Sequence, residues 1–144
     1  MTDDAFSLDS FLPYLLNQAA ERASARFADV YKSRYGLLRT DWRVLFHLGR
    51  FGQMTARDIG ARTHEDKTRI SRSVARLEGR GFLTREADPE DRRAERLSLT
   101  DAGRKVFADL SAEAAAHDAA LAAKIGARDM AVLKGMLEKL TRAA

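Results

Sequence analysis

The sequence predicts a mainly α-helical chain that is interrupted once, by a small β-hairpin. Three observations lead to this expectation. Hydrophobic residues make up 45% of the 144 residues, which is enough to build a core. Apolar residues recur at helical spacing over most of the chain. The clearest exception is the turn Asp88–Arg93, with the sequence DPEDRR, which separates two short strand-like segments.

Two helices are expected in the first third of the chain. The first runs from about Ser10 to Tyr35, because leucine, alanine and phenylalanine recur there every three or four residues. Gly36 is a natural stop for this helix. The second begins near Thr40, a residue type that often caps a helix N-terminus, and ends in the glycine-containing segment 49–52.

Two further helices follow closely. Thr55 is a candidate cap for a short third helix, and the segment 63–66 forms a break after it. A fourth helix is expected from about Asp66 to Arg80. Its apolar residues fall on one stripe, which predicts a core-facing side. These residues are Ile70, Val74 and Leu77.

The hairpin and two C-terminal helices complete the prediction. Residues 81–86 form one strand and residues 95–99 return antiparallel to it, with Leu97 and Leu99 alternating with polar residues. Thr100 then caps a long helix, and a last helix spans about Ala127 to Leu140. Short helices followed by a two-stranded hairpin form a winged helix-turn-helix, in which the hairpin is the wing.

Positive charge is concentrated on the fourth helix. From residue 67 to residue 80 there is a single anion, Glu78, and the cations are Lys67, Arg69, Arg72, Arg76 and Arg80. The net charge of this short strip therefore equals the +4 of the whole chain. A cationic strip on a nearly balanced protein is the electrostatic pattern expected for binding a DNA backbone. A solvated basic helix face is the alternative interpretation.

Other classes of protein are disfavoured. The absence of cysteine excludes disulfides, thiolate zinc sites and cysteine redox chemistry. No metal or cofactor is expected, since the three histidines are scattered and no phosphate-binding glycine loop is present. The sequence contains no HExxH motif and no nucleophile elbow, so an enzyme is not expected.

A cytoplasmic location is expected. The acidic start, residues 1–4, lacks the basic region of a secretory signal. No apolar stretch is long enough to span a membrane.

Several motifs, in their order and spacing, resemble the MarR family of bacterial transcriptional regulators. The likeness covers about residues 37–103. Its motifs are Thr40–Leu45, Lys67–Arg72, Leu77–Leu83, Asp88-Pro89-x-Asp91-x-Arg93 and Leu99-Thr100-x-x-Gly103. The resemblance implies one MarR-type domain over residues 1–144, with a winged helix lobe at 37–103 and dimerisation helices at 8–36 and 104–144. It also implies a homodimer, most often a repressor, that binds a pseudo-palindromic operator and is released by a small ligand.

The resemblance and the chemistry of the side chains together predict the DNA contacts. The fourth helix would enter the major groove, where Arg69 and Arg72 read bases. Arg93 at the wing tip would enter the minor groove, held by a salt bridge from Asp91, because a narrow groove attracts a guanidinium. The remaining predicted contacts are Thr68 and Ser71 to bases, and Lys67, Arg76 and Arg92 to phosphates.

An effector site is a further expectation. Members of the family often bind an aromatic acid or phenol where the DNA-binding lobe meets the dimer helices. The residues that would line such a pocket here are Tyr14, Trp42, Arg43 and Phe46, with Arg43 pairing with a carboxylate. Ordinary core packing of Trp42 and Phe46 is the alternative. The alternative to the whole assignment is a helical protein-interaction module whose winged domain no longer binds DNA.

Overall fold

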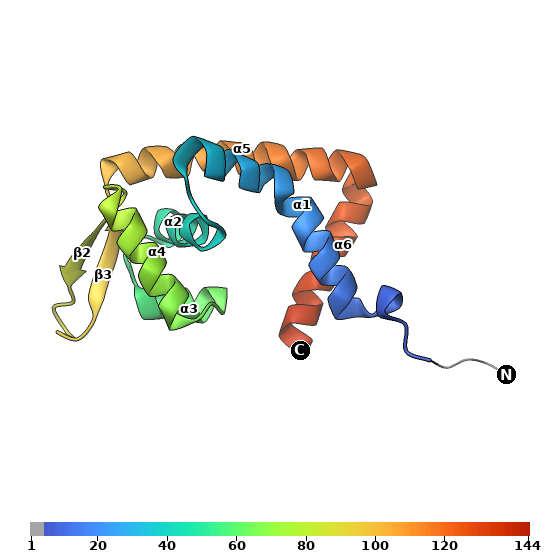
Figure 1. Cartoon of the computed structure of the whole chain (residues 1–144), viewed down its shortest axis with the longest axis horizontal. Coiled ribbons are helices and arrows are strands. Elements are labelled where there is room, and N and C mark those ends of the chain that lie inside the picture. Colours follow the sequence, from blue (N-terminus) through green and yellow to red (C-terminus); the bar gives the residue numbers. More distant parts are fainter. Residues whose placement is uncertain (1–4) are drawn as a thin grey trace. The chain divides into compact units, whose positions relative to one another are not determined.

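The computed structural model describes residues 5–144, so the acidic start at residues 1–4 lies outside the described part. The chain forms two compact units. One is residues 30–115, and the other combines the chain up to residue 29 with residues 116–144. The elements, drawn in Figure 1, are η1 Leu8–Ser10, α1 Leu12–Tyr35, α2 Arg39–Phe51, β1 Met54–Thr55, α3 Ala56–Thr63, α4 Lys67–Gly79, β2 Leu83–Ala87, β3 Glu95–Leu99, α5 Asp101–Ile125 and α6 Ala127–Ala143.

The ends of the helices follow from local hydrogen bonds. Gly36, with a φ of 64°, follows the last residue of α1, as the sequence predicted. The cap of α2 differs from the prediction, because the N-cap is Leu38 rather than Thr40. The carboxylate of Asp41 accepts a hydrogen bond from the Leu38 N–H at 2.9 Å, so a side chain three residues inside the helix satisfies the free backbone donor.

The Thr55 cap of α3 agrees with the prediction, and α4 begins directly after Asp66, where the sequence predicted its start. Thr55 and Asp58 form a reciprocal capping box, in which each side chain accepts a hydrogen bond from the backbone N–H of the other residue. Asp66 caps α4 by accepting from the N–H of Arg69 at 2.8 Å. Between the two helices His64 adopts a φ of 57°, which ends α3 and turns the chain into α4.

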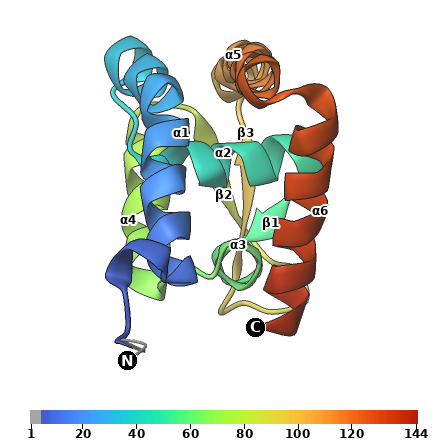
Figure 2. The same cartoon turned by 90° about the vertical axis from the view of Figure 1, so that its right-hand side faces the viewer.

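The wing belongs to a three-stranded antiparallel sheet in the order β1-β3-β2, and Figure 2 shows β1 beside β3. The predicted two-stranded hairpin is present, with Leu83 opposite Leu99. The third strand was not predicted. It is β1, which pairs Met54 with Leu97 and Thr55 with Arg96, and its two residues are too few to show alternation in the sequence.

The junction between the sheet and α5 depends on a threonine and a glycine. The Thr100 hydroxyl donates to the carbonyl oxygen of Gly81 at 2.6 Å and accepts from the N–H of Gly103 at 3.0 Å. A Cβ atom on Gly103 would overlap the carbonyl oxygen of Phe82. The Leu-Thr-x-x-Gly motif is therefore a packing requirement, because only glycine lets α5 approach the backbone before β2 so closely.

The core of the unit formed by residues 30–115 lies between the helix-turn-helix, the sheet and the start of α5. The three apolar residues predicted for the inner side of α4 are all buried. So are Leu97 and Leu99 on β3. Their buried neighbours from the other elements include Leu37, Val44, Leu45, Leu48, Ile59, Leu83, Val106 and Leu110.

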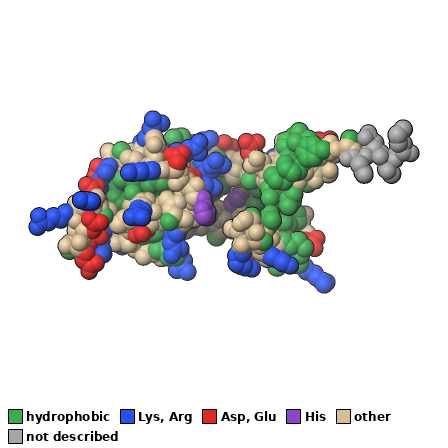
Figure 3. All heavy atoms as spheres, turned by 90° about the horizontal axis from the view of Figure 1, so that it is seen from below, with side chains coloured by type: hydrophobic (Ala, Val, Ile, Leu, Met, Phe, Trp, Pro, Cys, Tyr) green, Lys and Arg blue, Asp and Glu red, His purple; other side chains and the backbone are tan. Residues whose placement is uncertain are grey.

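The other unit has little core of its own. No residue of α6 is buried, although the predicted apolar stripe is present. Phe27 is buried, and the imidazole of His117 lies 2.5 Å from the carbonyl oxygen of Ala23. The large exposed apolar side chains of this unit are Phe6, Leu8, Phe11, Leu12, Leu15, Ile125, Val132, Leu133, Met136 and Leu137. Hydrophobic side chains gather next to the N-terminal end in Figure 3.

Among residues 5–144, no helix is long and apolar enough to cross a membrane.

Candidate nucleic-acid interface

The outer face of α4 is polar, cationic and exposed. Five of the predicted DNA-contacting residues are exposed there: Lys67, Thr68, Arg69, Ser71 and Arg72. Because Ile70, Val74 and Leu77 fix the opposite side of the helix in the core, this face is directed outward. α4 lies beside α3 and the wing strands of the same unit (Figure 1). The structure therefore brings these five side chains together on one helix surface.

Arg76 is placed differently from the exposed cations. Its guanidinium makes three hydrogen bonds of 2.8–3.2 Å to the carboxylate of Asp41 on α2. The Asp41 side chain is 1% exposed and that of Arg76 is 37% exposed, so the pair is a structural link between α2 and α4. A carboxylate buried in this way needs a cationic partner. Arg76 thus positions α4 through Asp41, and the phosphate contact expected of its guanidinium stays a prediction.

Arg80 is a second structural cation, and the sequence interpretation did not separate it from the strip. Its guanidinium donates to the carbonyl oxygens of Tyr35 and Gly36 at the C-terminal end of α1. A cation at that end satisfies carbonyl groups that have no helical partner. The cationic strip of α4 therefore divides into Lys67, Arg69 and Arg72, which face outward, and two arginines that bind to the protein itself.

The wing tip is ordered by the backbone. Asp91 Oδ1 accepts a hydrogen bond from the N–H of Arg93 at 3.0 Å, and Asp91 O accepts one from the N–H of Ala94 at 3.0 Å. Among the ion pairs of the described residues there is none between Asp91 and the Arg93 guanidinium, so that salt bridge stays a prediction for the DNA-bound wing. Asp91 instead fixes the turn that carries Arg92 and Arg93, whose side chains are exposed.

Ion pairs connect the wing to the rest of its unit. Arg85 on β2 lies 3.2 Å from Glu78 at the end of α4 and 3.4 Å from Glu95 on β3. At the base of the turn, Arg96 pairs with Asp88 at 3.5 Å. These partly exposed pairs are individually weak. Together they connect the recognition helix, both wing strands and the turn.

Three of the residues predicted for the effector pocket, Trp42, Arg43 and Phe46, lie on α2 and have partners within the unit of residues 30–115. Trp42 and Phe46 pack edge to face with ring centroids 5.1 Å apart, and Phe46 packs on Phe107 of α5 at 5.2 Å. Arg43 is paired with Glu65, whose side chain is 8% exposed, at 2.9 Å. Tyr14 belongs to the other compact unit. Packing and ion pairing therefore account for the three residues of α2.

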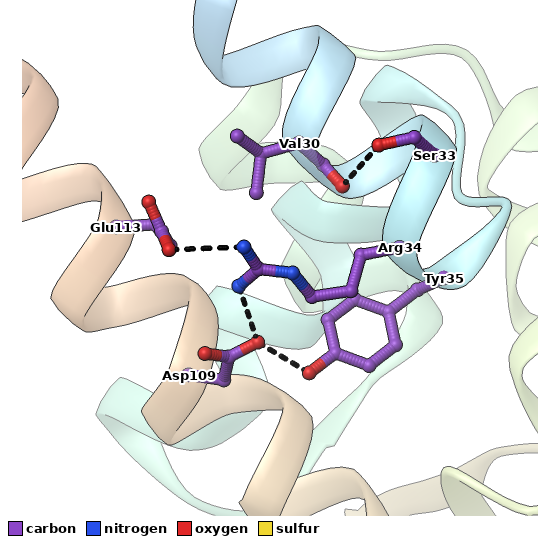
Figure 4. Close-up of polar contacts among 6 residues, drawn as sticks. All are labelled: Val30, Ser33, Arg34, Tyr35, Asp109 and Glu113. Carbon is purple, nitrogen blue, oxygen red and sulfur yellow. Dashed lines mark hydrogen bonds and ion pairs between the residues drawn. The ribbon is translucent and has the colours of Figure 1, made fainter.

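A polar cluster holds the end of α1 against α5 within the unit of residues 30–115. Figure 4 shows the Arg34 guanidinium between Asp109 at 2.9 Å and Glu113 at 3.1 Å. The Tyr35 hydroxyl donates to the same Asp109 oxygen as Arg34, at 2.5 Å. The hydrogen bonds from Tyr35 and Arg34 lower the pKa of Asp109. The hydrogen bond to Asp109, and then burial, raise the pKa of Tyr35.

The fold and the exposed α4 face define a class of protein: a winged helix-turn-helix with a cationic recognition helix. A sequence model described as the MarR family matches residues 35–94. A MarR family transcriptional regulator from Silicibacter pomeroyi DSS-3 is 32% identical, with a TM-score of 0.84 over 96% of this chain and 98% of that one. The chain belongs to the MarR family and is a DNA-binding transcriptional regulator.

Two further relatives agree with this assignment. The chain is 29% identical to an uncharacterized HTH-type transcriptional regulator, YwoH of Bacillus subtilis (strain 168), over 69% of this chain and 72% of the relative. It is 26% identical to the PcaV transcriptional regulator from Streptomyces coelicolor, solved in complex with its natural ligand. That similarity has a TM-score of 0.79 and covers 96% of this chain and 97% of the other.

Proposed function

We propose that the protein is a homodimeric repressor that binds a pseudo-palindromic operator, with α4 of each subunit in a major groove and each wing tip in a minor groove. The observation that carries this proposal is the division of the α4 cations. Two of them, Arg76 and Arg80, bind to the protein, while Lys67, Arg69 and Arg72 face solvent from a rigidly seated helix. Of these three, Arg69 also lies 3.6 Å from the Asp66 carboxylate, in a pair that is exposed on both sides and therefore weak. A held helix with exposed cations is suited to the major groove.

Each exposed residue has a distinct role in this proposal. Arg69 and Arg72 read base edges, since a guanidinium can bind guanine through two hydrogen bonds. The short side chains of Thr68 and Ser71 contact bases at close range. Lys67 and Arg92 neutralise phosphates, and Arg93 inserts into the minor groove. The Asp91 carboxylate supports Arg93 by accepting a hydrogen bond from the Arg93 backbone N–H.

Homodimerisation is supported by the unit that contains α6. Large apolar side chains on η1, α1 and α6 are exposed, and none on α6 is buried. An apolar surface of this kind is costly in water and is typical of an interface. A second copy of the chain would cover it, which makes residues 8–36 and 104–144 the dimerisation helices. Two copies would also place two recognition helices on one duplex.

Release of the operator by a small ligand completes the proposed regulation. The relative PcaV was solved in complex with its natural ligand. For our protein we retain an aromatic acid or phenol as the class of effector. Because Glu65 already occupies the Arg43 guanidinium, a carboxylate ligand at Arg43 would have to compete with an ion pair that is partly shielded from solvent.

The test is selection of bound duplexes from a random pool, followed by a salt titration. We expect the selected duplexes to share an inverted repeat. We also expect the logarithm of the DNA-binding constant to fall steeply and linearly with the logarithm of the salt concentration, because several phosphates are neutralised. A protein-interaction module that has lost DNA binding would recover no repeat and would show a flat salt response. Addition of aromatic acids to the bound complex then tests ligand release.

A further inference from the structure

One arginine joins the C-terminal ends of α1 and α4. The Arg80 guanidinium donates to the carbonyl oxygens of Tyr35, the last residue of α1, and of Gly36, which follows it. Gly36 has a φ of 64°, and a Cβ atom there would lie 2.8 Å from the Arg80 guanidinium. Glycine at position 36 therefore turns the chain and also leaves room for the guanidinium.

The end of α1 that receives this guanidinium is itself fixed to α5. The Tyr35 hydroxyl donates to Asp109 at 2.5 Å, and the Arg34 guanidinium pairs with the same carboxylate (Figure 4). The Tyr35 ring packs edge to face on Phe82, in the segment between α4 and β2, with ring centroids 6.4 Å apart. The carbonyl oxygen of Phe82 accepts a hydrogen bond at 3.0 Å from the N–H of Thr100, just before α5. These contacts connect the ends of α1 and α4 with the start of α5.

The attachments of α4 and its exposed cations lie at different ends of the helix. Arg76, in the last turn, is bonded to Asp41, and Arg80 follows the helix directly. The exposed cations lie nearer the N-terminal end. α4 has 13 residues, which makes it about 20 Å long. A tilt of about 10° at the attached end would move the other end by roughly 3 Å, close to the rise of one base pair.

The helices that hold α4 in this way are the ones that continue into the other compact unit. α1 up to residue 29 and α5 from residue 116 belong to that unit, which is the one proposed for dimerisation. In a dimer, the distance between the two recognition helices depends on how each α4 is set on α1 and α5. That distance has to match the separation of two half-sites on the duplex.

We propose that Arg80 is a positioning residue that determines which half-site spacing the protein accepts. It holds the end of α4 on α1 and, through Tyr35 and Asp109, on α5. This inference rests on the proposed binding of a homodimer to an inverted repeat. Arg80 itself contacts no base. It sets where the two copies present the residues that do.

The test compares binding of the full-length protein to the selected operator and to versions with one base pair added or removed between the half-sites. One base pair displaces a half-site by about 3.4 Å along the duplex and by about 34° around it. The wild-type protein should strongly prefer the selected spacing. In Arg80→Gln the ratio of the binding constants for the selected and altered spacings should fall about tenfold, the scale of one lost hydrogen bond to a charged group. Discrimination against base changes within a half-site should remain.

Three further variants separate position from charge. Tyr35→Phe loosens the link to α5 without changing charge, so the spacing ratio should fall in the same direction by a smaller factor. Arg80→Lys keeps the charge but lacks the planar fork that reaches two carbonyl oxygens, so it should restore only part of the ratio. Lys32→Gln removes an exposed cation from the last turn of α1 and should leave the ratio unchanged. Melting temperatures confirm that each variant is folded.

Two results would overturn the proposal. One is an unchanged spacing ratio in Arg80→Gln. The other is an equal loss of affinity at every spacing, with full recovery in Arg80→Lys and a salt slope lower by about 1 in Arg80→Gln, which would make Arg80 a phosphate contact. Failure of the proposed function would look different, because the wild-type protein would then select no inverted repeat, and this inference would fall with it.

Discussion

Arg76 on α4 makes three hydrogen bonds to the buried carboxylate of Asp41 on α2. The same carboxylate caps α2 through the N–H of Leu38. One side chain therefore starts one helix and anchors another, and the anchored helix is the one proposed to enter the major groove. The orientation of the recognition helix is thereby linked to the core.

Asp41→Ala tests this anchor. The change removes the partner of Arg76 and the cap of α2, so we expect the free energy of unfolding to fall by about 2–4 kcal/mol. Chemical denaturation measures it. The matched control is Asp58→Ala at the equivalent position of α3, which is exposed, and its loss should be about 0.5–1 kcal/mol. If both variants lost the same free energy of unfolding, the interaction between Asp41 and Arg76 would contribute nothing to stability.

Arg72→Ala tests base reading by α4. Arg72 is exposed, so its removal should leave stability unchanged and reduce operator affinity by about 1–3 kcal/mol, with relaxed discrimination at one base pair. Lys67→Ala is the comparison, since loss of a phosphate contact should weaken all sequences equally and reduce the salt slope by about 1. Binding to a panel of single-base operator variants separates the two results. A uniform loss with Arg72→Ala would reassign that residue to the backbone.

Arg93→Ala tests the wing. The side chain is exposed, and Asp91 holds only the backbone of the turn, so the dimer should stay folded. Operator affinity should fall by about 1–2 kcal/mol, the order of one lost arginine contact. Fluorescence anisotropy with a labelled operator measures the loss. Glu90→Ala alters the same turn without removing a cation and should not weaken binding. Wild-type affinity in Arg93→Ala would refute the minor-groove assignment.

Gly103→Ala tests the close approach of α5 to the start of β2. The added Cβ atom would overlap a backbone oxygen of Phe82, which cannot move away as a flexible side chain could. We expect a loss of several kcal/mol, on the order of 3, or failure to fold. Gly79→Ala is the control, because nothing lies within 4 Å of a Cβ there. Alanine in α4 should raise stability slightly, by about 0.5 kcal/mol, in thermal or chemical unfolding.

Asp109→Asn tests the cluster between α1 and α5. Tyr35 and Arg34 lower the pKa of Asp109, so its contribution to stability is present above the ordinary aspartate pKa of about 3.9 and is lost as pH falls through the lowered value. The wild-type protein should therefore exceed Asp109→Asn in stability at neutral pH. The difference should shrink as pH falls below about 4. Unfolding measured across that range in both proteins checks this, and a constant difference would contradict it.

The sequence predicted the helices well because their apolar residues follow the helical repeat over many turns. It also predicted the hairpin, since Leu97 and Leu99 alternate with polar residues. β1 was missed because two residues carry no periodicity. Residue type alone favours Thr40 as a cap, whereas the hydrogen bond that caps α2 comes from Asp41.

The candidate interface was only partly predictable. Charge counting cannot tell a cation that faces DNA from one that binds inside the protein, so Arg76 and Arg80 were grouped with Arg72. One signal was available: Asp41 lies at helical spacing from Leu45 and Leu48, on the buried stripe of α2. A carboxylate on a core-facing stripe requires a buried partner, which points to an arginine on a neighbouring helix. The backbone role of Asp91 depends on turn geometry that residue types alone do not specify.

The most direct test of the central claim is the mass of the complex formed with the selected operator, measured by native mass spectrometry or analytical ultracentrifugation. The account predicts two chains on one duplex that contains both half-sites, and loss of that complex when either half-site is scrambled. A single chain bound per duplex, or undiminished binding with one half-site scrambled, would contradict recognition by a symmetric pair of α4 helices and wings.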